Sequence, residues 1–316
     1  GHKVIIATGG GDALGRVKCG VDVVSGLMNK RRIARTLKEI SRIIEENEID
    51  TVHTHHRYCE LLANTAKPGA VKTVLTALSI VDRRYFVDYR SDKIIAVSNS
   101  VKKMLTEKFR VNENKIVTIP NFADSAELAR SGPFQKRDSS EFTIFSAGRF
   151  HEEKDPVTLL KAIEILKGRN VKLILAGSGE LEDELKRFCS GRGLNVVFMK
   201  PQEDLSDPFS KADLCMLTSV RDPLPTFLLQ SGLHSKIFAG ARTDGIAEII
   251  SDRKNGLLFE PRDAKAAADA VLFAMGNPEA CRDFAVNLHK EVMENFTEQV
   301  NTKKIIRIYD ELAGMK

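Results

Sequence analysis

The 316-residue sequence contains no tryptophan and only 4 tyrosines, which limits the partners that it can recognise. Proteins that bind single-stranded nucleic acid stack the bases on aromatic side chains interleaved with cations. The basic amino-terminal half of this chain lacks such a pattern. The sequence therefore argues against nucleic acid as a partner.

Apolar runs long enough to cross a bilayer are also missing, and no signal peptide opens the chain. The 5 cysteines are scattered, without a CxxC pair. An odd number of scattered cysteines is typical of a protein with reduced thiols. We therefore expect a cytoplasmic protein, and membrane association stays open.

Clusters of metal ligands are nearly absent as well. His53, His55 and His56 lie close together in the sequence, but no cysteine or carboxylate stands at zinc-ligand spacing from them. The sequence therefore predicts no metal site. No Ser/His/Asp set and no Cys/His pair for nucleophilic catalysis is apparent either.

Charge is unevenly distributed along the chain. Residues 1–138 carry 24 Lys+Arg and 16 Asp+Glu, whereas residues 139–316 carry 24 and 27. In the predicted helix at residues 29–48, apolar residues fall on one face and most cations on the other. Two interpretations stay open: a solvated face over a sheet, or a surface that meets an anionic acceptor or a membrane.

Short apolar runs alternate with helical patterns along most of the chain. We predict strands at residues 71–76, 93–98, 115–119, 142–147, 171–176, 196–199, 214–218 and 237–239. This alternation is typical of an α/β fold with parallel sheets and helices on both faces. The length suffices for two domains, a polar stretch at 125–140 suggests the linker, and an amphipathic helix is expected at 297–314.

Two cations follow the predicted strand 142–147. Arg149 comes directly after Gly148, and Lys154 precedes Asp155 and Pro156, a suitable N-cap and first residue for a helix. In open α/β sheets, ligands bind at the carboxyl ends of the strands. The pair suits a diphosphate, although two ordinary surface cations would give the same pattern.

A second polar group brackets a predicted helix that begins near Thr226. Asp222 lies before the helix, and Gln230 lies eight residues later, about two turns into it. The unpaired N–H groups at a helix start bind phosphate. Asp222 and Gln230 are therefore expected to hold the two ends of one elongated ligand.

The order and spacing of these segments resemble the retaining GT-B glycosyltransferases of family 4 (glycosyl transferases group 1). In that family, a G-R-x-x-x-x-K segment and an E-x7-E segment hold a nucleotide sugar. Arg149 and Lys154 match the first segment in spacing, and Asp222 and Gln230 stand where the two glutamates would be. Residues 245–250 and 255–259 match further stretches, so the resemblance covers nearly the whole chain and is strongest at 142–273.

The resemblance implies two Rossmann-like domains that face a cleft. Their expected bounds are 1–124 for the acceptor-side domain, 125–140 for the linker and 141–296 for the nucleotide-sugar domain, with a terminal helix at 297–316 that crosses back. The segment beginning at Gly1 resembles the family's second strand, so the first βα unit is expected to be absent. His55 matches the second histidine of the family's D-x-V-H-x-H segment, which faces the transferred sugar, although a hydrogen-bonded strand-end histidine is the alternative.

The resemblance also implies sugar transfer with retained configuration from a nucleotide-diphosphate donor, without a metal or other cofactor. The catalytic residues are expected to be His55, Arg149, Lys154 and Asp222, with Asp222 bonding a sugar hydroxyl. The remaining donor contacts are expected from Gly148, Gly177, Gly179, Glu180, Leu224, Pro225, Thr226, Phe227 and Gln230. UDP or GDP is the expected nucleotide, and the acceptor is left open as anionic or lipid-linked.

Two alternatives stay open: the first is favoured by Gln230 and by the expected absence of the first βα unit, and the second would also need cleft histidines and carboxylates. Gln230 replaces a carboxylate and would bond ribose hydroxyls more weakly. The alternatives are a GT-B scaffold that binds a nucleotide sugar without turnover, and an enzyme of the UDP-sugar epimerase type.

Overall fold

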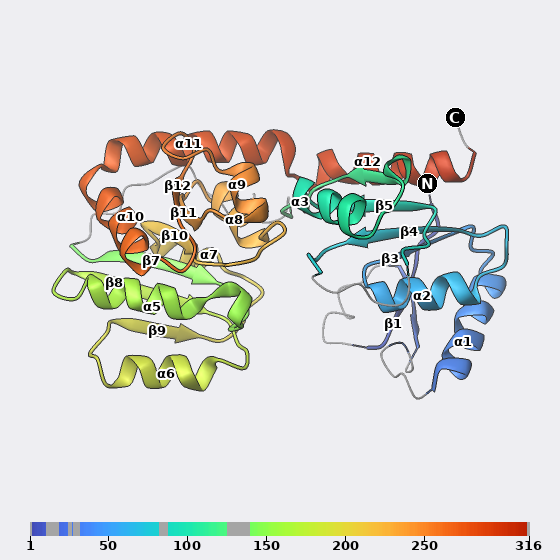
Figure 1. The fold of residues 1–316 in the computed structure, drawn as a ribbon, viewed down its shortest axis with the longest axis horizontal. Helices are drawn as coiled ribbons and strands as arrows, with labels where there is room; N and C mark the ends of the chain where they lie inside the picture. Colours follow the sequence, from blue (N-terminus) through green and yellow to red (C-terminus); the bar gives the residue numbers. More distant parts are fainter. Residues whose placement is uncertain are drawn as a thin grey trace. The chain divides into compact units, whose positions relative to one another are not determined.

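The computed structural model describes residues 2–10, 19–24, 27, 32–81, 88–124 and 140–314. The predicted linker lies almost entirely outside these residues. The chain divides into two compact units, one comprising Gly1–Val97, Val101–Ile119 and Lys304–Lys316, and the other Ser98–Ser100 and Pro120–Lys303. Each unit is an α/β structure with its own parallel sheet, as the alternating sequence pattern predicts (Figure 1).

The first unit is built on a parallel sheet with the strand order β3-β4-β5-β6. Its strands are β3 (Thr51–Thr54), β4 (Lys72–Ala77), β5 (Lys93–Ala96) and β6 (Ile116–Thr118). A separate parallel pair is formed by β1 (Ile5–Thr8) and β2 (Gly20–Val23). Parallel neighbours need a crossover connection, and α2 (Arg57–Ala66) supplies the one between β3 and β4.

Three apolar clusters give the first unit its core. One packs β1 and the helices α1 (Ile33–Glu46) and α2 (Arg57–Ala66) together around Ile40, Ile44 and Leu62. The second packs β4 and β5 against α3 (Asn99–Lys103) and the π-helix η3 (Met104–Lys108). The third joins β4 and β5 to the last helix, α12 (Glu298–Leu312), through Ile308. A helix late in the chain thus covers part of the sheet of the first unit.

The second unit contains a six-stranded parallel sheet with the order β12-β11-β10-β7-β8-β9. The strands are β7 (Phe142–Ala147), β8 (Val171–Ala176), β9 (Val196–Met199), β10 (Leu214–Leu217), β11 (Ile237–Ala241) and β12 (Leu257–Phe259). The helices are α5 (Pro156–Ile165), α6 (Glu182–Ser190), α7 (Ser206–Lys211), α8 (Thr226–Leu233), α9 (Asp244–Ile249), α10 (Ala264–Gly276) and α11 (Pro278–Asn295). Figure 1 shows β9 and α6 at one edge of this layered unit.

Alternate residues of the central strands pack into two cores, one on each face of this sheet. Ile144 packs with α5 and α10, whereas the next residue, Phe145, packs with α7 and α8. Side chains along a strand point alternately to opposite faces, so an almost continuous apolar run is needed here. This doubly wound arrangement explains why 142–147, 171–176 and 196–199 were predicted with the bounds that the structure has.

Several other predicted bounds were wrong by a few residues, and two strands were not predicted. The prediction places the end of β5 two residues too late, at 98 rather than Ala96, and the end of β10 one residue too late, at Thr218 rather than Leu217. β11 continues two residues further than predicted, to Ala241, and β2 and β12 had no predicted counterpart. The Thr218 hydroxyl donates to the Asp155 carbonyl at 2.7 Å, which ties the residue after β10 to the start of α5. Helix α1 begins at Ile33, and residues 29–31 of the predicted helix lie outside the described residues.

Candidate functional site

The carboxyl edge of the second sheet has a switch point between β7 and β10. From β7 the chain proceeds outward through β8 and β9, and it then returns to place β10 on the other side of β7. The loops after β7 and β10 therefore leave in opposite directions and form a crevice at this edge, which is where ligands bind in open α/β sheets. Arg149, Lys154 and Asp222 all lie in these two loops.

The loop after β7 is shaped by a helix start with the predicted cap. Asp155 has a left-handed backbone (φ 45°), and its carboxylate accepts the Thr158 N–H at 3.2 Å and the Thr158 hydroxyl at 2.6 Å. Pro156 is the first residue of α5. The short 3-10 helix η5 (Glu152–Lys154) precedes this cap and ends at Lys154. The predicted N-cap and proline positions are confirmed.

Main-chain bonds join the loop after β10 to η5. The Val220 N–H donates to the Glu153 carbonyl at 2.9 Å, one residue before Lys154. As a result the Lys154 ammonium donates to the Asp222 carboxylate, although the two residues are far apart in the sequence. The Ser219 hydroxyl also donates to this carboxylate, at 3.3 Å.

Asp222 is buried, with 3 % of its surface exposed. Burial raises the pKa of Asp222, while the Lys154 ammonium and the Ser219 hydroxyl act in the opposite direction. Lys154 was predicted as a cation available to a diphosphate, but in this structure its charge compensates a buried carboxylate. The two predicted residues thus meet each other directly.

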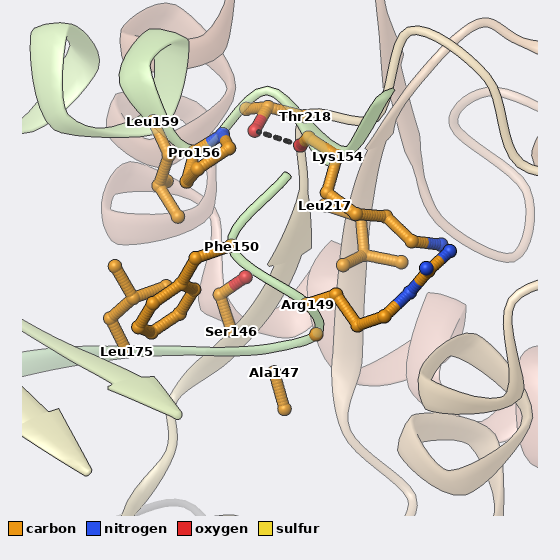
Figure 2. A pocket seen from close by; sticks show the side chains of 11 residues that line it. Ser146, Ala147, Arg149, Phe150, Lys154, Pro156, Leu159, Leu175, Leu217 and Thr218 are labelled. Carbon is orange, nitrogen blue, oxygen red and sulfur yellow. Dashed lines mark hydrogen bonds between the residues drawn. The ribbon is translucent and has the colours of Figure 1, made fainter. Parts of the chain in front are cut away.

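Arg149 lies on the exposed side of the same crevice. Figure 2 shows its side chain and that of Lys154 extending toward the same side of the loop. Beneath the loop is a pocket of about 20 Å³, room for roughly one water molecule, with Ser146, Arg149, Lys154 and Thr218 among its walls. The cationic ends therefore lie at the rim of the crevice rather than in a preformed cavity.

The loop after β8 packs tightly on the loop after β7. The Phe150 N–H donates to the Ser178 carbonyl at 2.9 Å. Gly177 and Gly179 have φ of 151° and 157°, and a Cβ atom on Gly177 would lie 1.9 Å from the Gly148 carbonyl oxygen. Both glycines are thus required for this close approach. Glu180 is exposed and lies 3.6 Å from the His151 ring nitrogen.

The start of α8 offers main-chain donors rather than side chains. Its N-cap is Pro225, which makes no side-chain cap bond. The side chains of Leu224 and Phe227 are in the core, each 5 % exposed, whereas Thr226 is exposed. Because α8 begins at Thr226, Gln230 lies about one turn into the helix, not two, and it is half-buried.

Residues at the start of α9 complete this edge and were not predicted as part of it. The Gly245 N–H donates to the Asp222 carbonyl at 3.0 Å, and a Cβ atom on Gly245 would lie 1.9 Å from the Pro223 carbonyl oxygen. Burial raises the pKa of Asp244, against a hydrogen bond from the Asp222 main chain. The sequence match of residues 245–250 marked this segment, but it gave no sign of the contact with Asp222.

The predicted histidine lies in the first unit, at the end of β3. The rings of His53 and His55 are stacked, with centroids 4.5 Å apart and planes at 27°. His53 Nδ1 is 2.5 Å from the Tyr309 hydroxyl, and Nε2 is 2.7 Å from Thr76 Oγ1. Burial and the neighbouring His55 lower the pKa of His53 to about 3, and desolvation lowers the pKa of His55. His55 itself is exposed.

The described residues offer neither a metal-ligand cluster nor a membrane-spanning helix. There, no three or more histidine, cysteine, aspartate or glutamate side chains are placed to hold a metal ion together. None of the helices in the described ranges combines the length and apolar character that crossing a bilayer requires.

The parallel sheets in two units, with a polar crevice at a switch point, define the GT-B class of fold. A family model described as "Glycosyl transferases group 1" matches residues 132–291, and one described as "Glycosyltransferase Family 4" matches residues 1–127. The chain belongs to the glycosyl transferases group 1 family.

Individual relatives agree with this family. An uncharacterised glycosyltransferase of Methanocaldococcus jannaschii is 26 % identical over 71 % of this chain and 61 % of its own length. The Campylobacter jejuni "GalNAc-alpha-(1->4)-GalNAc-alpha-(1->3)-diNAcBac-PP-undecaprenol alpha-1,4-N-acetyl-D-galactosaminyltransferase" is 28 % identical over 71 % of this chain and 60 % of its own length. The chain thus spans less than two thirds of both relatives.

The crystal structure of Anabaena HepE in complex with UDP-glucose has the same fold. It superposes with a TM-score of 0.82 at 16 % identity and covers 97 % of this chain and 91 % of HepE. The predicted α/β GT-B fold is therefore confirmed.

Proposed function

We propose that this protein transfers a hexose from a nucleotide-diphosphate sugar to an acceptor, with retained configuration and without a metal ion. The observation that carries the proposal is the crevice at the β7–β10 switch point, where Arg149, Lys154 and the N–H groups at the start of α8 lie beside the buried Asp222. Cations and a helix start together suit a diphosphate leaving group. HepE, a protein of this fold, was crystallised with UDP-glucose.

In the proposed reaction, Arg149 and Lys154 stabilise the diphosphate as the glycosidic bond breaks. Lys154 reaches the phosphates by releasing Asp222, whose carboxylate then accepts a hydrogen bond from a sugar hydroxyl. Gly148, Gly177, Gly179 and Glu180 lie along the base and ribose, and Gln230 bonds the ribose hydroxyls. His55 contacts the transferred sugar from the acceptor side, and positioning together with charge stabilisation supplies the rate enhancement.

For the acceptor, we propose an anionic, lipid-linked molecule, because the Campylobacter relative is named for a substrate on PP-undecaprenol. Helix α1 presents Arg35, Lys38 and Arg42, which supports peripheral membrane contact. Arg35 and Arg42 are each paired with a glutamate one turn later, Glu39 and Glu46, so the net charge of this face is moderate. Sedimentation with anionic and neutral vesicles tests this contact.

A thermal-shift panel of UDP, GDP and ADP sugars tests donor binding, since a ligand of the folded state raises the melting temperature. Product analysis by NMR then reports the anomeric configuration of the transferred sugar, and activity in EDTA reports metal dependence. We expect stabilisation by one nucleotide class and a retained configuration. No stabilisation by any of these sugars, or an inverted product, contradicts the proposal.

A scaffold that binds the donor without turnover is the second candidate, favoured by Gln230 at a position where the family has a carboxylate. Donor binding without product or hydrolysis would establish it. An epimerase would instead convert the nucleotide sugar itself, and NMR of the sugar after incubation without an acceptor separates that reaction from transfer.

A further inference from the structure

His53 is held through both of its ring nitrogens. Nδ1 bonds to the Tyr309 hydroxyl on α12 at 2.5 Å, and Nε2 bonds to Thr76 Oγ1 on β4 at 2.7 Å. A ring with both nitrogens bonded to different elements can neither rotate nor flip without breaking a hydrogen bond. Three segments, β3, β4 and α12, thus fix one imidazole.

This fixed ring supports the one exposed histidine that the sequence places at the site. His53 is in β3, and His55 is the first residue after the strand. Their rings stack at 4.5 Å. Stacking on a fixed ring restricts the orientations that the His55 imidazole can adopt.

We propose that Tyr309 and Thr76 are positioning residues for His55: they clamp His53, and the clamped ring sets the orientation of the His55 imidazole at the end of β3. The role of His55 toward a sugar rests on the proposed function. The clamp itself is a property of the first unit alone. Through this clamp, Tyr309 of α12 helps to orient the histidine that is proposed to face the acceptor.

The charges around this group favour two neutral rings. Burial and the neighbouring His55 lower the pKa of His53, and desolvation lowers the pKa of His55. Further titratable groups near this pair, within the described ranges, include Tyr309 and His2, whose rings are 6.0 Å apart, and Asp310, which lies 3.4 Å from His2 Nε2. A neutral His55 offers one donor and one acceptor to a sugar hydroxyl.

The test compares Tyr309→Phe and Thr76→Val with the control Glu311→Gln. Tyr309→Phe removes the hydroxyl and keeps the ring, and Thr76→Val removes the other bond. Glu311 is on the same helix and pairs with Lys93 of β5 at 3.1 Å, so its substitution weakens helix docking without touching His53. NMR of histidine-labelled protein gives the titration midpoint of His55, and hydrolysis of UDP-glucose and affinity for UDP are measured separately.

In Tyr309→Phe and Thr76→Val, we expect the His55 midpoint to rise toward its ordinary value of about 6.5, because loss of the stacked His53 ring reduces the desolvation that lowers this pKa. Hydrolysis is expected to fall roughly three- to tenfold, the loss that one hydrogen bond accounts for. UDP affinity stays unchanged. In a His55→Ala background, Tyr309→Phe should reduce hydrolysis no further, because the two changes then act through the same group.

Two results overturn the clamp: an unchanged His55 midpoint in both variants, or an equal shift in Glu311→Gln. If the parent protein neither binds nor hydrolyses any of the UDP, GDP and ADP sugars, the proposed function fails. The titration midpoints then decide the positioning by themselves, so the two failures are distinguishable.

Discussion

The polar groups of the two units are held in place by different kinds of contact. In the second unit, main-chain bonds between adjacent loops bring Lys154 to Asp222, as when the Val220 N–H bonds to the Glu153 carbonyl. In the first unit, side-chain hydroxyls hold His53, and one of them, on Tyr309, comes from the far end of the chain. A site held by the main chain depends on close backbone approach. A site held by side chains depends on single hydroxyls and on protonation.

The largest expected effect is a loss of stability in acid at the His53 site of the first unit. The pKa of His53 is about 3 in the folded protein, and an unfolded histidine titrates near 6.5. Between these values the unfolded chain binds the additional proton, so stability is complete above pH 6.5 and is lost as the pH falls toward 3. The expected loss approaches roughly 1.4 kcal/mol per pH unit, a few kcal/mol in total.

Hydrogen exchange of the β3 and β4 amides as a function of pH measures this loss. His53→Gln is the control, since glutamine does not titrate and retains a group that can bond to Thr76. The acid sensitivity of these amides should be reduced in that variant. If it is the same in both proteins, the loss of stability in acid has another origin.

The next largest expected effect is the loss of unfolding free energy on substitution of a glycine in the loops of the second unit. Gly177→Ala places a methyl group 1.9 Å from the Gly148 carbonyl oxygen, at a φ that alanine rarely adopts. We expect a loss of roughly 2–4 kcal/mol in unfolding free energy, from overpacking and backbone strain together. Gly191→Ala, where no atom lies within 4 Å of the added Cβ, is the matched control. Urea unfolding that shows equal stability for both variants would contradict the close approach of the two loops.

Substitutions of the two cations of the crevice should affect stability and nucleotide binding to different extents. Lys154→Met leaves the buried Asp222 carboxylate without its counter-ion, so we expect a loss of about 2 kcal/mol, restored in part by adding Asp222→Asn. Arg149 is exposed, so Arg149→Met should change the free energy of unfolding by less than about 0.5 kcal/mol.

Both cation variants should bind UDP more weakly, by roughly 1.5–3 kcal/mol at most for each lost charge-assisted bond. Arg149 should account for more of the affinity, because Lys154 must first leave Asp222. Calorimetry with UDP and thermal unfolding of both variants give the two quantities. A larger affinity loss from Lys154→Met would show that its ion pair with Asp222 does not compete with the ligand.

The smallest expected effect is that of Gln230→Glu. A carboxylate accepts hydrogen bonds from ribose hydroxyls more strongly than an amide does, so donor affinity or turnover should rise by roughly two- to fivefold. Titration with the nucleotide sugar that the panel selects measures it, with Gln230→Ala as the control for loss of the contact. A large loss with glutamate would mean that the pocket is built around the amide.

The sequence predicts the sheet of the second unit well because each buried strand is an uninterrupted apolar run. It predicts Asp155 and Pro156 at the helix start for an equally local reason, since a cap is decided within a few residues. β12 was not predicted because a strand of three residues is too short to show a hydrophobic periodicity.

Contacts between distant segments could not be predicted in the same way. Lys154 and Asp222 are both identifiable as candidates, but their ion pair depends on β10 lying beside β7, which no local pattern specifies. The bond between His53 and Tyr309 depends on where the last helix docks. Sequence patterns select the candidate residues, and the topology decides which of these candidates meet.

Helix α12 also bears on how the chain folds as it is made. Ile308 of α12 packs into the same core as Val74, Ile95 and Ile119, yet the ribosome delivers it only after the entire second unit. Domains generally fold as units, in the order of synthesis. Here the first unit must wait with its β4–β5 face uncovered while the second unit is completed. During that interval the apolar side chains on this face lack the cover that Ile308 gives them in the folded protein, and exposed apolar surface of this kind favours aggregation.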